Sequence, residues 1–315
     1  MNKRTAAQIH TTDTWLLKSE NTGQEYRISV SLPVSYDHEL EKTYPTVYMV
    51  DGNVFYEMVT GAARLMAMSG LIPEVIIVSV GYPIDSLYGD DWLQFFVRRS
   101  KDLTSVVDER YEEFVSSLVN DPRRARTATS KKKEFEELGR SDINDPVTAV
   151  ETGHAEPFRK LVTEELPPLV EERYRVDPHD KTLLGDSTGG HFALYSLFTE
   201  PGSFQRYVVG SPTLGYGDRA LFKLESAYAE AHQELTARLF LGIGDQEELA
   251  PFSAQGHRGV IVTVSDFYRF AAILEERRYD SLQFTKRVFT GFDHTDAPGP
   301  IFASGLRYVF NETAV

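Results

Sequence analysis

The chain has 315 residues, of which 41% are hydrophobic and 12% aromatic, enough to build one sizeable core. It contains no cysteine, which excludes disulfides, a thiol nucleophile and a cysteine-ligated zinc ion. Its formal net charge of −14 disfavours nucleic acids and anionic membrane surfaces as partners, because like charges repel.

The N-terminus carries no visible targeting segment. The first residues are basic, but no apolar stretch follows them, as a secretory signal requires. No apolar run approaches the length of a membrane-spanning helix. We therefore expect a cytoplasmic protein with no membrane association, although a secreted protein whose signal has been removed would look the same.

The first part of the chain predicts two kinds of strand. Leu16–Lys18 and Glu25–Leu32 flank a turn at Asn21–Gly23 and form an antiparallel hairpin, the second strand alternating apolar and polar residues. Thr46–Val50 and Val75–Val80 are continuous apolar runs, typical of strands that are buried on both faces. Apolar residues at helical spacing lie between these two runs, over Val54–Met68.

Helix and strand patterns alternate through the rest of the chain. This alternation predicts an α/β fold with a mostly parallel central sheet, helices on both faces and the antiparallel N-terminal hairpin at one edge. We expect a single domain over residues 1–315. The predicted helices are Phe158–Tyr174, His191–Phe198, Arg219–Gln233, Thr263–Arg278 and Ile301–Phe310, and the strands are Thr182–Leu184, Tyr207–Val209, Arg238–Leu241 and Leu282–Phe289.

Residues 101–150 interrupt this alternation with many charges of both signs, among them Lys131–Lys133. The simplest interpretation is a solvated helical insertion. A lid over the active site or a dimer contact is the sharper interpretation, so homo-oligomerisation stays open. A basic nucleic-acid patch is disfavoured, because acidic residues slightly outnumber basic ones in this segment.

The strongest local motif is Gly-Asp-Ser-Thr-Gly at residues 185–189, placed between a predicted strand and a predicted helix. In such a nucleophile elbow the serine sits on a strained turn, and glycines flank it because side chains there would collide with neighbouring backbone. The alternative is a glycine-rich turn without chemistry. The strand-to-helix context favours the α/β-hydrolase fold, with Ser187 as nucleophile and the Thr188 N–H as an oxyanion donor.

A serine hydroxyl needs a base and an acid, which in this fold follow the serine in the order acid, then histidine. Only His232, His257 and His294 come late enough, and His294 alone follows a predicted strand and precedes the last helix. His294 is therefore the predicted base. The acid is expected in the loop after Leu239–Leu241, where spacing does not separate three carboxylates: Asp245, Glu247 and Glu248.

The second oxyanion donor is expected in the loop after Thr46–Val50. Gly52 allows close approach of the backbone to a substrate, and the N–H of Asn53 or Val54 is the predicted donor. An ordinary turn is the alternative interpretation of these residues.

These segments resemble the esterase family of the α/β-hydrolase superfamily, which includes siderophore esterases, feruloyl esterases and esterase D-like enzymes. The resemblance is strongest to the siderophore-esterase-like subgroup and covers nearly the whole chain except residues 105–150. The matching stretches are Tyr44–Asn53, Gly81–Pro83, Arg98–Thr104, Phe158–Tyr174 and Ser211–Leu214.

The resemblance implies that Ser187, His294 and Glu247 occupy the positions of nucleophile, base and acid. It is the resemblance that favours Glu247 over its two neighbours. The chain departs from the family pattern where Gly215 and Tyr216 stand in place of two tryptophans, which alters an aromatic wall near the site.

The predicted activity is serine carboxylic-ester hydrolysis of a small-molecule substrate through an acyl-enzyme intermediate, with neither metal nor cofactor. An acyltransferase would use the same three residues with an alcohol as acceptor. A non-catalytic interaction module is least favoured, because all three positions hold competent residues. A siderophore trilactone is an alternative substrate: Arg98 and Arg99, with Tyr216, are candidates to line its pocket, whereas the net charge fits a neutral ester at least as well.

Overall fold

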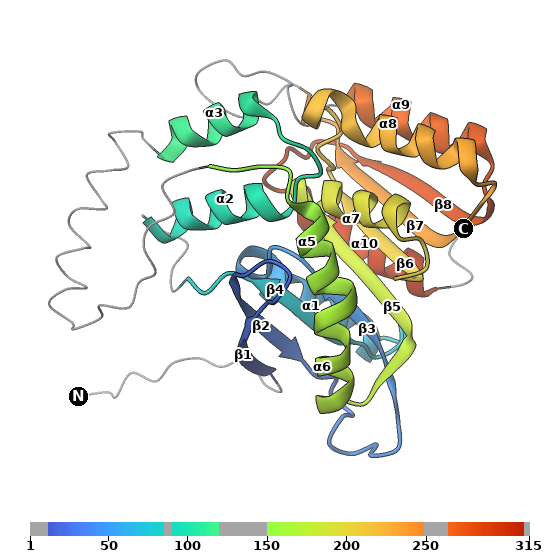
Figure 1. Cartoon of the computed structure of the whole chain (residues 1–315). Coiled ribbons are helices and arrows are strands. Elements are labelled where there is room, and N and C mark those ends of the chain that lie inside the picture. The colour runs from blue at the N-terminus through green and yellow to red at the C-terminus, as the bar shows by residue number, and fades with distance from the viewer. Residues whose placement is uncertain (1–11, 85–89, 120–149, 249–263, 312–315) are drawn as a thin grey trace, which may run out of the picture.

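The computed structural model describes residues 12–84, 90–119, 150–248 and 264–311 (Figure 1). Within these ranges, eight strands form one sheet in the order β1-β2-β4-β3-β5-β6-β7-β8. The strands are β1 (Thr12–Lys18), β2 (Glu25–Ser31), β3 (Tyr44–Met49), β4 (Ile76–Gly81), β5 (Val176–Asp186), β6 (Arg206–Gly210), β7 (Glu234–Gly244) and β8 (Asp280–Phe289). The helices are α1 (Gly52–Met68), α2 (Asp90–Asp102), α3 (Glu109–Val119), α5 (Ala155–Lys160), the π-helical turn η1 (Leu161–Glu165), α6 (Leu166–Arg173), α7 (Thr188–Thr199), α8 (Tyr216–Ala231), α9 (Val264–Arg277) and α10 (Pro298–Phe310).

The sheet has the predicted mixture of strand directions. Strand β1 pairs antiparallel with β2, and β2 pairs antiparallel with β4. All other neighbouring strands are parallel. The α/β fold, the mostly parallel sheet and the antiparallel hairpin at its edge are therefore confirmed.

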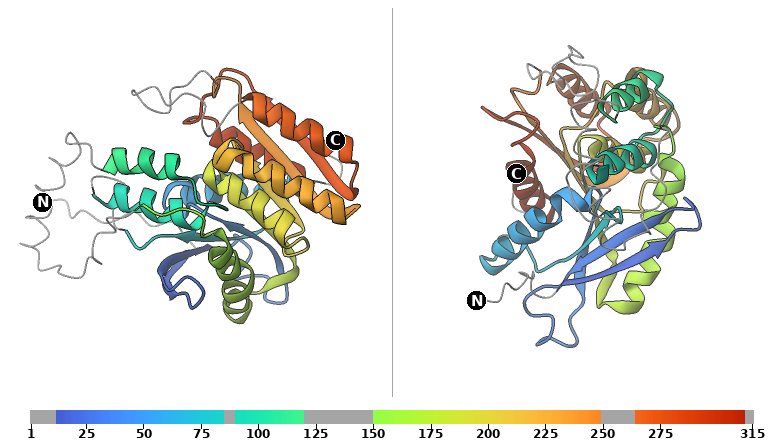
Figure 2. Two further views of the ribbon diagram at one scale, coloured as in Figure 1. Left: turned by 45° about the horizontal axis from the view of Figure 1, so that its top comes forward. Right: turned by 90° about the vertical axis from the view of Figure 1, so that its left-hand side faces the viewer.

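Helices cover both faces of the sheet (Figure 2). Because side chains alternate along a strand, neighbouring residues such as Leu183 and Leu184 enter different cores, and both are fully buried. Helices α1 and α10 cover one core, and α5 to α9 cover the other. This double coverage explains why the parallel strands are continuous apolar runs in the sequence.

Several elements differ from the sequence predictions. The helix predicted at Phe158–Tyr174 is divided into α5, η1 and α6, because Pro167 and Pro168 have no N–H to continue the regular hydrogen-bond pattern. Strand β5 begins at Val176, well before the predicted Thr182. The sequence did not indicate the first half of this strand, because its residues are mostly polar.

Helices α2 and α3 pack against each other beside the carboxyl ends of the strands (Figure 1). Helix α2 was not predicted, whereas α3 falls in the predicted helical insertion. The remainder of that insertion, residues 120–149, lies outside the described residues. Its role as a lid or dimer contact, and the single-domain organisation, stay predictions.

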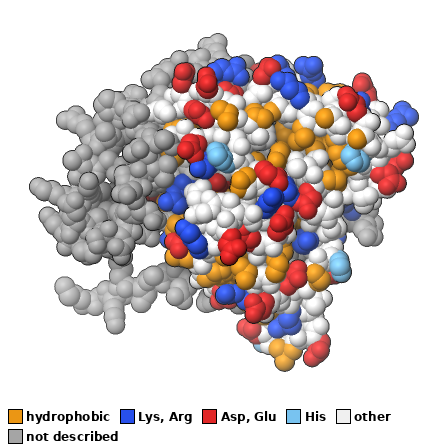
Figure 3. Space-filling view, in the orientation of Figure 1, with side chains coloured by type: hydrophobic (Ala, Val, Ile, Leu, Met, Phe, Trp, Pro, Cys, Tyr) orange, Lys and Arg blue, Asp and Glu red, His pale blue; other side chains and the backbone are white. Residues whose placement is uncertain are grey.

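The surface mixes charges of both signs. Figure 3 shows acidic and basic side chains interspersed on the face that it displays. In the described part of the chain, no helix combines the length and apolar character needed to cross a membrane. The expected cytoplasmic location stays a prediction.

Candidate active site

The turn between β5 and α7 is the strained elbow that the motif predicts. Ser187 has φ 59° and ψ −120°, a backbone conformation that is rare for a residue with a side chain. The Ser187 N–H donates to the Gly210 carbonyl at 3.0 Å, which holds the elbow against the end of β6. Ser187 is 8% exposed, so little of the residue faces solvent.

The elbow requires glycines because the backbone comes very close to itself there. A Cβ at position 185 would lie 2.2 Å from the Gly189 carbonyl oxygen, and one at position 190 would lie 2.5 Å from the Gly210 carbonyl oxygen. Both obstacles are backbone atoms, which cannot rotate away as a side chain can.

We predict that Gly185→Ala lowers the free energy of unfolding by about 3 kcal/mol, because the added methyl group overpacks a rigid turn. Gly61→Ala is the matched control: nothing lies within 4 Å of its Cβ position, inside α1. That change should raise the free energy of unfolding by about 0.5–1 kcal/mol, since alanine is the better helix former. Urea unfolding curves of both variants measure the two free energies. If both substitutions changed the free energy of unfolding in the same direction, the crowding argument would be contradicted.

Three of the predicted site residues form a hydrogen-bonded chain. The distance from Ser187 Oγ to His294 Nε2 is 3.0 Å, and that from His294 Nδ1 to Glu247 Oε2 is 2.8 Å. They come from the elbow, from the loop after β8 and from the loop after β7, which meet because parallel strands end at the same edge of the sheet.

The loops that carry Glu247 and His294 are joined by further hydrogen bonds. The backbone N–H of Asp245 donates to the carbonyl of Phe289. The backbone N–H of Gln246 donates to the carbonyl of Phe292, and both distances are 3.0 Å. The Asp245 carboxylate accepts from the Gly291 N–H at 2.8 Å. These bonds fix the distance between the two loops, and so between the imidazole and the carboxylate.

The three candidate carboxylates have different partners. Glu247 is the one in contact with His294, and its second oxygen accepts from the Ser211 hydroxyl at 2.6 Å and the Gly244 N–H at 2.7 Å. Asp245 holds the histidine loop, as described above. Glu248 is exposed and accepts from the N–H and hydroxyl of Ser265 at the start of α9.

Electrostatics at the histidine favour its protonated form. Burial by itself lowers the pKa of His294, but the hydrogen bond to Glu247 and the negative charges of Asp186 and Glu247 outweigh it, so the pKa is raised above its ordinary value. Asp186 directly precedes the serine and is buried, and that burial raises the pKa of its carboxyl to about 7.

The predicted oxyanion loop lies at the start of α1. The Val54 N–H donates to the Asp51 carbonyl at 2.9 Å and so is used within its own turn, which leaves Asn53 as the better of the two predicted donors. The Asn53 side chain pairs with both backbone groups of Tyr82, at 2.6 and 2.9 Å. Gly52 packs against Ser79, whose hydroxyl would lie 2.6 Å from a Cβ.

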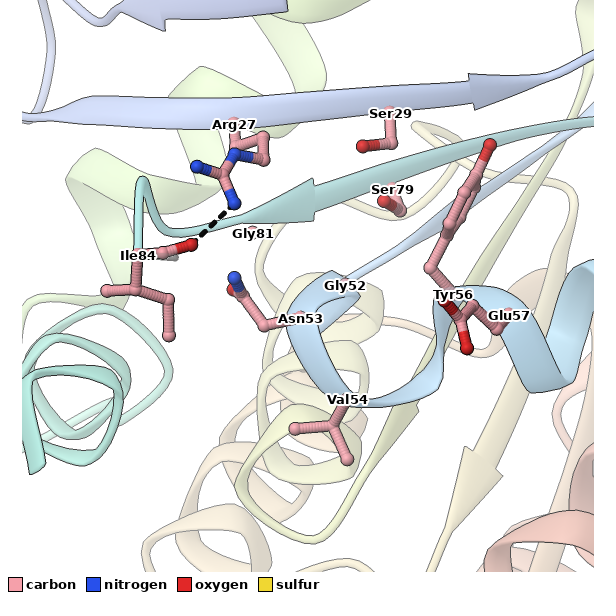
Figure 4. Close-up of a pocket in the computed structure, with 10 residues that line it drawn as sticks. All are labelled: Arg27, Ser29, Gly52, Asn53, Val54, Tyr56, Glu57, Ser79, Gly81 and Ile84. Carbon is pink, nitrogen blue, oxygen red and sulfur yellow. Dashed lines mark hydrogen bonds between the residues drawn. The ribbon is translucent and has the colours of Figure 1, made fainter. Parts of the chain in front are cut away.

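The same loop forms one wall of a pocket of about 330 Å³ (Figure 4). The other walls come from β2 and β4, and the lining mixes both signs of charge with small polar groups. The lining residues are Arg27, Ser29, Gly52, Asn53, Val54, Tyr56, Glu57, Ser79, Gly81 and Ile84.

The predicted substrate-lining residues are more enclosed than the sequence implied. Arg99 is 7% exposed and donates to Asp51 and Thr188. Tyr216 is 1% exposed, and its hydroxyl donates to the Val106 carbonyl at 2.8 Å. Arg98, the residue before Arg99 on α2, is half-buried.

Sequence reasoning missed two contacts around the site. The Ser211 hydroxyl supports Glu247, and Arg99 joins the loop after β3 to the elbow. Both residues lie in stretches that carried the family resemblance, which is the signal that pointed to them. Their partners lie far away in the chain, and one sequence does not reveal such pairs.

Comparison with known proteins places the chain in a family. The family model described as "Putative esterase" matches residues 19–257, and the chain belongs to this esterase family. It is 28% identical over 301 residues to the ferri-bacillibactin esterase BesA of Bacillus subtilis, covering 84% of this chain and 91% of that protein. It is 25% identical to the siderophore enterobactin esterase of Emericella nidulans, covering 95% of this chain and 94% of that protein.

Solved structures share the fold. The crystal structure of the BES protein from Bacillus cereus matches with a TM-score of 0.71 and 24% identity, covering 98% of this chain and 99% of that one. The siderophore hydrolase EstB from Aspergillus nidulans matches with a TM-score of 0.71 and 21% identity, covering 99% of both chains. The family and its named relatives identify the chain as a carboxylic ester hydrolase.

Proposed function

We propose that the chain hydrolyses esters through an acyl-enzyme intermediate, with Ser187 as nucleophile, His294 as base and Glu247 as the acid. The observation that carries the proposal is the continuous hydrogen-bonded chain from the Ser187 hydroxyl, through both ring nitrogens of His294, to a buried carboxylate. This arrangement activates a hydroxyl that is otherwise a weak nucleophile.

The reaction has two steps. In the first, Ser187 Oγ attacks the ester carbonyl carbon while His294 Nε2 takes its proton. The tetrahedral intermediate then collapses, and the proton passes from His294 to the departing alcohol. In the second step, water attacks the acyl group on Ser187 by the same route, and this releases the acid.

Two backbone N–H groups are proposed to stabilise the negatively charged carbonyl oxygen. The Thr188 N–H is the first in α7, and the first N–H groups of a helix have no acceptor within it. The Asn53 N–H is the second in α1, which begins at Gly52, and it lies in the same first turn of its helix. Each such donor typically contributes about 3–4 kcal/mol to transition-state stabilisation.

We predict that activity falls in acid with an apparent pKa above the ordinary value of His294. The proposed base must be neutral, and since its pKa is raised, activity rises with pH until His294 loses its proton. The kcat/KM of p-nitrophenyl acetate hydrolysis as a function of pH measures this value.

His191 provides an internal comparison for that profile. It is fully buried, and its burial lowers the pKa to about 4, so its titration belongs to a separate and more acidic range. If kcat/KM fell only near pH 4, with no change at higher pH, the assignment of His294 as the base would be contradicted.

We further propose that the ester bond belongs to a siderophore. The support is that BesA, the Emericella nidulans enterobactin esterase and the Aspergillus fumigatus triacetylfusarinine C esterase are all named for siderophore esters. The net charge of −14 does not by itself favour an anionic ferric complex, so the substrate needs a direct test.

The test compares ferric bacillibactin, ferric enterobactin and triacetylfusarinine C with p-nitrophenyl acetate and butyrate. The proposal expects one siderophore to be hydrolysed with a kcat/KM about 100-fold above those of the simple esters. Hydrolysis of the simple esters alone would overturn the substrate class and leave the esterase mechanism intact. Methanol added to the same assays separates hydrolysis from acyl transfer, because an acyltransferase would form the methyl ester.

A further inference from the structure

Three separate segments meet at the guanidinium group of Arg99 on α2. Its Nε and Nη2 donate to the two carboxylate oxygens of Asp51, at 2.9 and 2.6 Å. Its Nη1 donates to the Thr188 hydroxyl at 2.7 Å. One side chain therefore links the loop after β3 to the first residue of α7.

The contact is buried and uses the whole guanidinium group. Arg99 is 7% exposed and Asp51 is 2% exposed, so their charges neutralise each other with little help from water. Each nitrogen of Arg99 is engaged. Only the planar, forked group of arginine makes such a paired contact and a third bond together, because a lysine amine is a single point charge.

Asp51 occupies a strained backbone position just before the oxyanion loop. Its φ of 55° and ψ of 37° lie in the left-handed region, which costs free energy for most residues with a side chain and is less unfavourable for aspartate. Gly52 and Asn53 follow directly, so the conformation of Asp51 sets the direction of their N–H groups. The paired contact with Arg99 restrains this conformation.

The Asp51 carboxylate also lies against the elbow itself. A Cβ at position 189 would come within 3.1 Å of Asp51 Oδ2 and 2.8 Å of Val50 Cγ2. The two backbone segments that carry the proposed oxyanion donors are thus packed together and joined by Arg99.

We propose that Arg99 is a positioning residue that fixes both halves of the oxyanion hole by holding Asp51 and Thr188 at once. The inference rests on the function proposed above. In this role Arg99 acts through the donors of Asn53 and Thr188 and makes no contact with the substrate. Oxyanion donors stabilise the transition state only when they are held in place before the reaction, so loosening them lowers kcat more than it changes KM.

Arg99→Lys tests this role, because it keeps the positive charge and removes the forked contact. We expect kcat for p-nitrophenyl acetate to fall about 100-fold while KM changes less than about threefold. Inhibition by an alkylboronic acid, whose serine adduct resembles the tetrahedral intermediate, should weaken by the same factor as kcat. The acid limb of the pH profile should stay in place, because the charge near His294 is retained.

Arg206→Lys is the matched control. Arg206 also pairs with both oxygens of an aspartate, Asp180, but at the opposite end of β6 from the elbow contact at Gly210. The same substitution there should lower the melting temperature and leave kcat unchanged. A loss of kcat in both variants, in proportion to their loss of folded protein, would overturn a specific role for Arg99.

Thr188→Val and Thr188→Ser keep the test decisive if Arg99→Lys does not fold. Valine has the shape of threonine without the acceptor, so kcat should fall about tenfold, whereas serine keeps the hydroxyl and should recover most of it. Equal kcat values for these two variants, or a folded Arg99→Lys variant within about threefold of the wild type, would overturn the proposal. If Ser187→Ala stays active, the proposed function itself fails; if Ser187 is essential and Arg99→Lys is unaffected, only this inference fails.

Discussion

Replacing Ser187 with alanine is expected to lower kcat for ester hydrolysis by about 10⁵-fold or more, because no other group forms the acyl-enzyme. Alanine removes only the hydroxyl that contacts His294 Nε2, so the elbow backbone and the substrate site are retained. The variant should therefore unfold at a temperature close to that of the wild type. Initial rates with p-nitrophenyl acetate, at matched concentrations of folded protein, measure the loss.

Ser69→Ala is the control for this experiment. Ser69 is exposed at the end of α1, and its hydroxyl only donates to the Leu65 carbonyl. Its loss should leave kcat unchanged. A folded Ser187→Ala variant that keeps more than about a hundredth of wild-type activity would contradict the assignment of the nucleophile.

Glu247→Gln should lower kcat by about 10⁴-fold, the second-largest effect that we expect. In the wild type, one oxygen of Glu247 already accepts from the Ser211 hydroxyl and the Gly244 N–H. The carbonyl oxygen of glutamine would keep those bonds, which turns its amide N–H₂ towards His294 Nδ1. His294 would then carry its proton on Nε2, facing the serine, and would be unable to act as the base.

Glu248→Gln and Asp245→Asn provide controls from the same loop. Glu248 only holds Ser265, so its variant should keep wild-type kcat. Asp245 supports the Gly291 N–H in the histidine loop, so a modest loss of about tenfold is expected there. A larger loss in either control than in Glu247→Gln would identify a different acid.

The sequence was most informative where a local pattern and its place along the chain agreed. The glycine-flanked Ser187 lay between an apolar strand and a helix, and the structure has that strand, turn and helix. His294 was the late histidine that followed a strand, and it lies against the serine hydroxyl. In both cases the order of elements in a parallel sheet restricted where a side chain could be.

Sequence patterns gave incomplete predictions where contacts between distant residues determine the structure. The first half of β5 contains Asp177 and Lys181, yet it forms strand, because β5 pairs with β3 as far as Val176. Spacing also left the acid open among three neighbouring carboxylates. What distinguishes Glu247 is its contact with a histidine that lies 47 positions later in the chain.

The enclosure of Arg99 shows the same limitation at the site. Together with Arg98, it suggested a contact with an anionic substrate. The structure instead pairs it with Asp51, 48 positions earlier in the chain, and with Thr188, 89 positions later. The charge that was expected to meet a ligand is neutralised inside the protein, and this changed the role that we propose for it.

The most direct test of the central claim is the reaction of the wild-type chain with a fluorophosphonate, followed by mass spectrometry of the intact protein and its peptides. The hydrogen-bonded chain through His294 predicts one adduct per chain, located on Ser187, formed in parallel with the loss of esterase activity and absent from Ser187→Ala. Full esterase activity in a chain that carries this adduct, or inactivation with the adduct on another residue, would contradict the account.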